Sequence, residues 1–161
     1  MYRDIVAQAR TPFFYSAYGV PDTLDGRFDM IVLHAYLAMR RLTAAGEAGQ
    51  TLSQALFDLM FADMDSSLRE IGVGDLSVGK KVKVMAQAFY GRAEAYEAGL
   101  AAPGDDTLVA ALNRNLYGTL PAQPAETARM VAYMRAADAA LRSQPDSELL
   151  GGKAAFPAPA G

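Results

Sequence analysis

The segment GDLSVGKK, from Gly74 to Lys81, comes close to the pattern of a phosphate-binding loop. Such a loop has a Gly, four residues, a second Gly, a Lys and then a Ser or Thr whose hydroxyl binds magnesium. Gly79 and Lys80 keep this spacing, but Lys81 supplies no hydroxyl. The loop should also follow a β-strand, whereas the preceding segment LFDLMFADMDSSLREI has a helical period. The sequence therefore disfavours nucleotide binding, which stays an alternative hypothesis for residues 74–81.

A joint between two helices explains the same segment better. Gly72 stands where a helix C-terminus favours a left-handed residue, and Gly74 allows a tight turn. Either Asp75 or Ser77 has the side chain to cap the helix that follows. We therefore predict that residues 72–77 connect two helices.

The acidic segment DMDSSLRE has some of the oxygen ligands that a calcium loop uses. That loop needs a Gly at its sixth position and a Glu at its twelfth, where this chain has Leu68 and Gly74. Calcium binding is disfavoured, and we predict no metal site. On a helix, Asp65 and Arg69 lie four residues apart and are expected to form a surface ion pair.

Asp63 falls at the edge of the apolar stripe of its helix, where a carboxylate needs a partner. The next helix presents Arg92 at the border of its own stripe and Lys81 about three turns earlier. We predict that Asp63 pairs with Arg92 or Lys81 and fixes the register of the two helices. A catalytic acid is the alternative interpretation, and ion pairs that perturb a carboxyl group are often structural.

His34 is the only histidine, and the chain has no cysteine. A multi-histidine or thiolate metal site within one chain is therefore excluded, together with disulfides and cysteine nucleophiles. His34 shares a helix face with Arg27 and Arg41, at intervals of seven residues. This spacing predicts a cationic stripe that is solvated or faces an acidic partner. Haem binding through His34 is an alternative hypothesis.

The elements that position these residues are all expected to be helices. Apolar stripes and turn signals predict helices at about 25–45, 51–71 and 75–100, then a shorter one from Asp105 or Asp106 and a long one around 130–141. The predicted fold is an all-α, single compact bundle of about five to six helices, preceded by the aromatic-rich leader PFFYSAYGVPD. Residues 1–150 form this domain, and the Gly- and Pro-rich segment 151–161 is predicted to be an extended, mobile tail.

The first long helix is apolar on a second side, where Met30, Leu33 and Leu37 lie away from its main stripe. Helices of this kind are usually central in a bundle. The alternative is that one side stays exposed to hold a hydrophobic client protein. The eight methionines fit both interpretations, because Met fills irregular cores and also suits adaptable binding surfaces.

Composition limits the function classes. A chain of 161 residues with 52% hydrophobic residues can build one packed domain. Its 15 Lys and Arg against 18 Asp and Glu give a net charge of -3, so no general attraction to nucleic acid is expected. The N-terminus lacks the apolar run of a signal peptide, and the longest apolar stretch is too short to span a membrane. We expect a soluble, cytoplasmic protein.

Three segments together resemble the ubiquinol-cytochrome c chaperone family in its bacterial form. They are VPDTLDGRFDMIVLHAYLAMRRL, LFDLMFADMDSSLREIGVGDLSVGKKVKVMAQAFYGRAEAY and DDTLVAALNRNLYG, which lie between Phe13 and Met134. Positions shared with the family are matched here by Pro21, Asp22, Thr23, Leu33, His34, Gly72, Val73, Phe89 and Tyr90. None of these is an established catalytic residue, so the resemblance implies a protein that is no enzyme.

The resemblance implies an all-helical assembly factor for ubiquinol-cytochrome c reductase, the third respiratory complex. Mitochondrial members attend newly made cytochrome b around the acquisition of haem and work with a small partner protein. For this chain the implied role is a cofactor-free chaperone of cytochrome b, in peripheral contact with the inner membrane at its cytoplasmic face.

Such a chaperone is expected to have an apolar or Met-rich groove rimmed by charges, among them Arg27, Arg41 and Lys83. Lys80 and Lys83 are predicted on the outward side of the third helix, and the Tyr90 hydroxyl is predicted to point outward. The full set of candidate partner-binding residues is Arg27, Met30, His34, Leu37, Arg41, Lys80, Lys83 and Tyr90.

Overall fold

The structure, a computed structural model, describes residues 1–160, and within them it has eight helices and no β-strand. The helices are α1 (Tyr2–Ala9), α2 (Pro12–Ala17), α3 (Leu24–Thr43), α4 (Gly46–Glu70), α5 (Asp75–Ala101), α6 (Asp106–Asn115), α7 (Pro124–Ser143) and α8 (Asp146–Leu150). The all-α prediction is confirmed. The predicted helices correspond to α3 to α7, whereas α1, α2 and α8 were not predicted.

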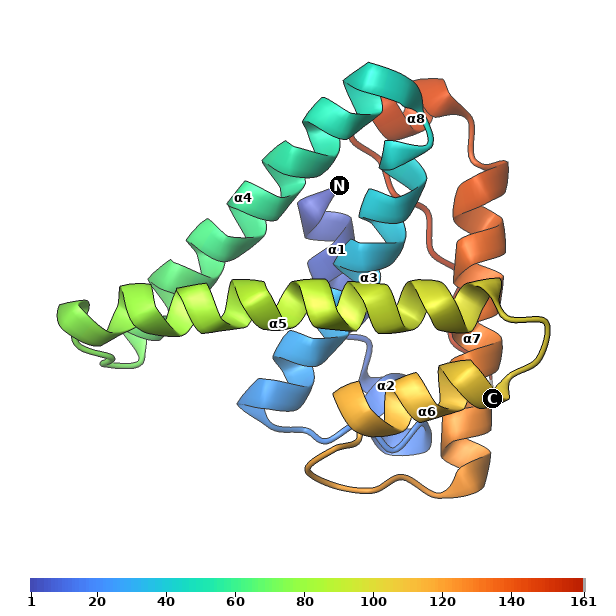
Figure 1. The fold of residues 1–161 in the computed structure, drawn as a ribbon, viewed down its shortest axis with the longest axis horizontal. Coiled ribbons are helices and arrows are strands. Elements are labelled where there is room, and N and C mark those ends of the chain that lie inside the picture. Colours follow the sequence, from blue (N-terminus) through green and yellow to red (C-terminus); the bar gives the residue numbers. More distant parts are fainter. Residues whose placement is uncertain (161) are drawn as a thin grey trace.

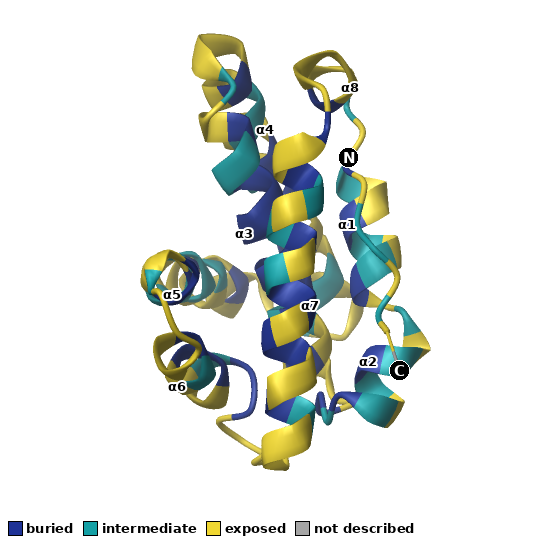
Figure 2. Cartoon of the chain, turned by 90° about the vertical axis from the view of Figure 1, so that its right-hand side faces the viewer, coloured by how far each residue is buried: buried dark blue, intermediate teal, exposed yellow. Residues whose placement is uncertain are grey.

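Helix α3 is the centre of the fold. Every residue from Ile31 to Met39 is buried, and the helix packs against α1, α4, α5 and α7 (Figure 2). Both of its apolar sides are therefore used in the core, which confirms the prediction of a central helix. Thr23 begins the helix, because its hydroxyl accepts a hydrogen bond from the Gly26 amide at 3.1 Å.

The other helices surround α3 in layers (Figures 1 and 2). Helices α5 and α6 lie on one side of α7, and α1, α2 and the C-terminal segment lie on the other. Helices α4 and α5 meet at the joint 71–74 and form a hairpin whose end projects from the body of the molecule (Figure 1). The α4–α5 hairpin thus leaves an opening beside the first half of α3.

The N-terminal segment, which includes the aromatic leader, is part of the core. It forms α1 and α2, and it buries Ile5, Phe14 and Tyr18. The Phe14 ring meets Tyr18 and Tyr133 edge to face, with centroids 5.5 and 4.8 Å apart. Aromatic rings in such pairs add stability beyond the area that they bury, so a segment without a clear helical period becomes a structural element.

The predicted start of the second long helix, at about residue 51, is wrong. Helix α4 begins five residues earlier, at Gly46, which has a φ of +82°. Gly49 lies inside the helix, where an added Cβ would be 2.0 Å from the Leu42 carbonyl oxygen. The two glycines allow a sharp turn and a close approach of α4 to α3. Glycine is also common in loops, so these residues did not indicate a helix in the sequence.

The joint between α4 and α5 is confirmed in position but not in its caps. Gly72 has a φ of +90°, as predicted for a left-handed helix end. The residue that caps α5 is Gly74, whose carbonyl accepts from the Ser77 amide, and no side chain makes a cap hydrogen bond. The prediction of an Asp75 or Ser77 cap is therefore wrong, because the Asp75 carboxylate pairs with Arg69.

The C-terminal segment from Lys153 to Ala160 is extended, as predicted. It makes contacts along its length: Ala154 is buried, the Pro157 carbonyl accepts from Gln8, and the Ala160 carbonyl accepts from Tyr18. These contacts tie it to α1 and α2. The predicted mobility of this tail stays a prediction.

Candidate functional site

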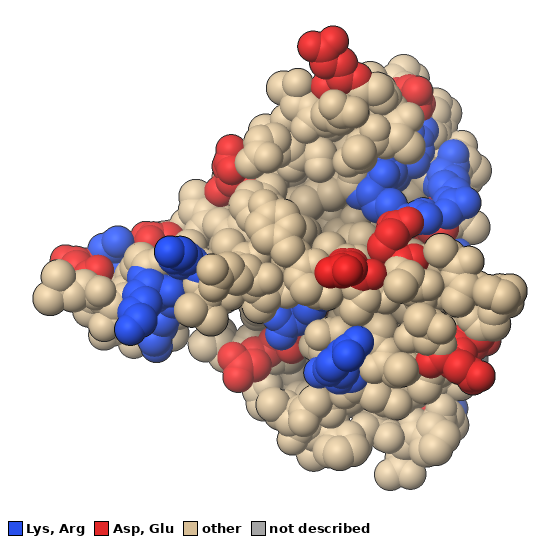
Figure 3. Space-filling model, in the orientation of Figure 1, with Lys and Arg blue, Asp and Glu red and all other residues tan. Residues whose placement is uncertain are grey.

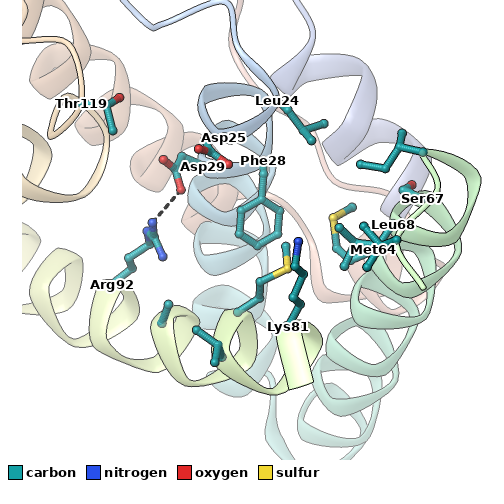
Figure 4. Close-up of a pocket in the computed structure, with 15 residues that line it drawn as sticks. Leu24, Asp25, Phe28, Asp29, Met64, Ser67, Leu68, Lys81, Arg92 and Thr119 are labelled. Atoms are coloured by element: carbon teal, nitrogen blue, oxygen red, sulfur yellow. Dashed lines mark ion pairs between the residues drawn. The ribbon is translucent and has the colours of Figure 1, made fainter. Parts of the chain in front are cut away.

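An apolar cleft opens between the start of α3, the end of α4 and the first half of α5, with a volume of about 520 Å³ (Figure 4). Its apolar lining consists of Leu24, Phe28, Met64, Leu68, Ile71, Val73, Val84, Met85 and Ala88. Three of these remain largely open to solvent: Leu24 is 63% exposed, Ile71 60% and Val84 57%. Large apolar side chains left exposed around one concavity are typical of a binding surface.

The sequence explains why the cleft stays open. Helix α5 directs Val78, Phe89 and Tyr96 into the core, and these residues follow one helical stripe. Val84 and Ala88 lie off that stripe and line the cleft, where Val84 is exposed and Ala88 is half-buried. At this position α4 and α5 diverge from α3, and their side chains do not fill the space between the three helices.

Charged side chains lie at the edges of this cleft. Arg92 on α5 pairs with Asp29 on α3 at 2.8 Å (Figure 4). Lys81 lines the cleft about three turns earlier on α5 and points toward Phe28. Asp25, one turn before Asp29, also contributes to the lining. The cleft therefore offers an apolar floor with cations and carboxylates at its border.

The Asp29–Arg92 pair lies in a poorly solvated place, since the two side chains are 13% and 20% exposed. Burial raises the pKa of Asp29 to about 6, although the nearby Arg92 guanidinium acts in the opposite direction. Within residues 1–160, the Arg92 Nε and the Tyr96 hydroxyl are buried without a hydrogen-bond partner. Two buried polar groups of α5 thus have unused hydrogen-bonding capacity.

The predicted ion pair of Asp63 with Arg92 or Lys81 is wrong. Asp63 instead accepts a hydrogen bond from the Tyr2 hydroxyl at 2.7 Å, because α1 packs beside this part of α4. Arg92 meets Asp29, since α5 crosses α3 at that point. The predicted pair of Asp65 and Arg69 is confirmed at 2.6 Å.

The cleft occurs on a fold that is already known from related proteins. A profile of the ubiquinol-cytochrome C chaperone family matches residues 16–156. This chain belongs to that family. The family assignment confirms the resemblance seen in the three segments of the sequence.

Relatives of the family agree in sequence and in fold. The crystal structure of the Cbp3 homolog from Brucella abortus superposes with a TM-score of 0.87 and 39% identity, over 98% of this chain and 86% of that one. Ubiquinol-cytochrome-c reductase complex assembly factor 1 of Xenopus laevis is 26% identical over 135 residues, which are 84% of this chain and 67% of the relative. The mouse protein is 25% identical, and the matched part is 45% of its length.

His34 does not belong to a surface stripe. It is fully buried, and each ring nitrogen has a partner: the Met30 carbonyl at 2.8 Å and the Tyr133 hydroxyl at 2.7 Å. Gln8 donates to the Tyr133 oxygen at 2.9 Å. Tyr133 therefore donates to Nε2 of His34, and Nδ1 carries the proton that is donated to Met30. Burial lowers the pKa of His34 to about 4, so the ring is neutral.

The two arginines of the predicted stripe are also engaged within the chain. Arg27 is exposed and pairs with Asp22 at 2.8 Å. Arg41 donates to the Leu141 and Gln144 carbonyls at the end of α7 and to Asp146. Arginine at a helix C-terminus satisfies free carbonyls. The prediction that Arg27, Arg41 and Lys83 rim the groove is wrong, because the charges at the cleft are Asp25, Asp29, Lys81 and Arg92.

The remaining candidates divide into core and surface residues. Met30 and Leu37 are buried at 0% and 1% exposure, so neither contributes to an outer surface. Lys80 and Lys83 are exposed on α5 but lie outside the cleft. Tyr90 is 61% exposed, as its outward position predicted, and its ring packs 5.5 Å from Phe57.

The structure gives no phosphate loop at residues 74–81, because Gly79 and Lys80 lie inside helix α5. Within residues 1–160, no three His, Asp or Glu side chains gather as metal ligands do. Across the same residues, no helix combines the length and the apolar character needed to cross a membrane.

Proposed function

We propose that this protein is a non-enzymatic assembly chaperone that binds newly made cytochrome b during the biogenesis of ubiquinol-cytochrome c reductase. Membership of the family supports the role in assembly. The observation that carries the proposal is the apolar cleft between α3, α4 and α5. The proposed place of action is the cytoplasmic face of the inner membrane, with a small partner protein of the kind that mitochondrial members use.

The cleft suits an apolar segment of a membrane protein that has not yet been built into its complex. A volume of about 520 Å³ accommodates several apolar side chains of a client helix lying in the groove. Burial of exposed Leu24, Ile71 and Val84 would favour binding by about 25 cal/mol for each Å² of apolar surface removed from water. The client's exposed apolar surface would be covered in the same step, which protects it from aggregation.

The charges at the border favour a client segment with a polar group beside its apolar face. Lys81, which is exposed, can bind a carboxylate or a carbonyl of the client at one edge of the cleft. A purely apolar segment would cover this ammonium group without giving it a partner. This arrangement discriminates among clients by hydrogen bonding, since an unpaired buried donor costs about 1–3 kcal/mol.

Two alternative functions have less support from the geometry. Haem ligation by His34 would require breaking its hydrogen bond to Tyr133 or to Met30. Magnesium-dependent nucleotide binding would require a loop at residues 74–81, which lie mainly on helix α5. Titration with haem, followed by the Soret band, and calorimetry with ATP and magnesium test these alternatives directly.

The proposal is tested by affinity capture from detergent-solubilised membranes with two matched variants. Val84→Glu places a carboxylate in the cleft, and Leu59→Glu makes the same change at a site outside it that is 52% exposed. We expect the wild type and Leu59→Glu to recover cytochrome b and Val84→Glu to recover at least tenfold less. The proposal is refuted if the wild type recovers no cytochrome b and a deletion strain keeps normal levels of the third complex.

A further inference from the structure

The projecting end of the α4–α5 hairpin carries apolar side chains that no other part of the protein covers. Leu76 is 101% exposed, the highest value among large apolar residues of the described chain, and Ile71 beside it is 60% exposed. Leu76 does not line the cleft and has no groove around it. Gly72 and Gly74 lie between these two residues, and a Cβ added at either glycine would meet no other atom within 4 Å. The hairpin end thus presents an apolar point rather than a pocket.

Lysines surround this apolar point. Leu76, Lys80 and Lys83 are four and seven residues apart, so they share one outward face of α5. Within residues 1–160, neither lysine takes part in an ion pair, and neither does Lys81. Arg69, the other basic residue near the hairpin end, is already paired with the carboxylates of Asp65 and Asp75.

The hairpin end has a charge opposite to that of the whole chain. Residues 69–83 contain four basic and two acidic side chains, a net charge of +2, whereas the chain has a net charge of -3. Figure 3 shows Lys and Arg gathered at this projecting end, with acidic side chains beside them. Positive charge and exposed apolar surface are therefore concentrated at one extremity of an acidic protein.

We propose that the hairpin end, defined by Ile71, Leu76, Lys80 and Lys83, binds the surface of an anionic lipid bilayer. Leu76 and Ile71 enter the boundary between headgroups and acyl chains, while the lysine stems follow them and keep the ammonium groups at the lipid phosphates. A bilayer fits better than an acidic protein, because a single protruding Leu without a groove needs a soft apolar phase. The inference rests on the proposed function only in placing the protein at a membrane.

The orientation that follows is compatible with the cleft. Ile71 lines the cleft and also belongs to the hairpin end, so the two surfaces are continuous. A protein attached by this end would hold the cleft mouth near the bilayer, where an apolar client segment emerges. Changes at the other three residues still separate the two activities, because Leu76, Lys80 and Lys83 lie outside the cleft.

Flotation of the full chain with vesicles tests this inference. The vesicles contain phosphatidylcholine alone or a mixture with phosphatidylglycerol, at low and at high salt. We expect binding to the anionic vesicles, weakened by salt, and little binding to the neutral ones. Lys80→Gln with Lys83→Gln should reduce the partition coefficient about 25-fold, at roughly fivefold for each lysine. Leu76→Ser should reduce it about tenfold.

Matched variants separate this site from general effects. Arg3→Gln with Arg114→Gln removes the same charge from exposed positions on α1 and α6, and Leu59→Ser removes an exposed leucine from the middle of α4. Both controls should bind nearly as the wild type does. Equal binding to neutral and anionic vesicles would overturn the inference, as would equal losses in the controls.

Failure of the membrane-binding inference can be distinguished from failure of the proposed client-binding function. Leu76→Ser should recover cytochrome b normally from detergent-solubilised membranes, because the cleft is unchanged. If the wild type recovers cytochrome b but does not float with anionic vesicles, the membrane site is wrong and the client site stands. Since Leu76 makes no core contact, the variant should keep the circular dichroism spectrum of the wild type.

Discussion

His34 is one group through which acid should destabilise this protein. The ring is fully buried and neutral, with a pKa of about 4 in the folded chain against an ordinary value of 6.5. Between these two values the unfolded chain binds a proton that the folded chain does not. Stability is therefore complete above pH 6.5 and falls as the pH decreases toward 4.

The difference in pKa sets the size of the effect. Each pH unit between 6.5 and 4 costs about 1.4 kcal/mol, so the total loss is roughly 3 kcal/mol. The geometry gives the physical reason, because Nε2 already accepts from the Tyr133 hydroxyl, which in turn accepts from Gln8. A proton on Nε2 would face the Tyr133 donor in a site that is closed to solvent.

Urea unfolding of the wild type and of His34→Gln, at intervals from pH 8 to pH 4, measures this loss. The glutamine oxygen can accept from Tyr133 but does not titrate, so the difference between the two pH profiles isolates the histidine. As His34 is the only histidine, its imidazole NMR signal also reports the pKa without overlap. Parallel pH profiles of the two proteins, or a folded pKa near 6.5, would refute the reasoning.

Two further predictions concern α5. Arg92→Met leaves the carboxylate of Asp29 without its cation, and we expect the free energy of unfolding to fall by about 3 kcal/mol at pH 8. This loss should be smaller in acid, because Asp29 is then protonated. Urea unfolding at pH 8 and at pH 5 checks this prediction, and an equal loss at both pH values would contradict it. Gly99→Ala places a Cβ 2.8 Å from the Leu108 Cα and should destabilise the protein by about 1–3 kcal/mol. Gly91→Ala, where an added Cβ meets no other atom within 4 Å, should stabilise it by up to about 1 kcal/mol. Thermal unfolding measures both variants, and the same shift in Tm for both would be inconsistent with the α5–α6 contact.

The long helices could be predicted because their signals are local. For α3, the apolar stripes and the turn signals predicted a helix at about 25–45, and the structure has Leu24–Thr43. For α5, the glycine joint and the run of apolar residues gave the beginning at Asp75 and the end near Leu100. Caps and stripes need no knowledge of distant residues.

The short helices and the partners of charged groups could not be predicted in the same way. Helices α1 and α2 are held by aromatic packing against α3 and α7, which are distant in the sequence. Asp29 was not considered as the partner of Arg92, since that pair depends on how α5 crosses α3. His34 shows the same limit, because its neighbours Tyr133 and Gln8 come from other helices.

The sequence predicted that an apolar groove exists, but not where in the fold it lies. The resemblance to the chaperone family implied an apolar or Met-rich groove, and the lining of the cleft includes Met64 and Met85. Its charged border was assigned to Arg27 and Arg41, which the fold uses in pairs within the chain. The rim of a groove depends on which helix faces remain uncovered, and one sequence does not determine that.

Site-specific photo-crosslinking in living cells tests the central claim most directly. A photoreactive amino acid at Val84, inside the cleft, is compared with one at Leu59, which is similarly exposed on α4 but outside it. The proposal predicts a crosslink from position 84 to newly made cytochrome b and none from position 59. A crosslink from position 59 alone, or no crosslink to cytochrome b from position 84 while the protein is needed for the third complex, would contradict it.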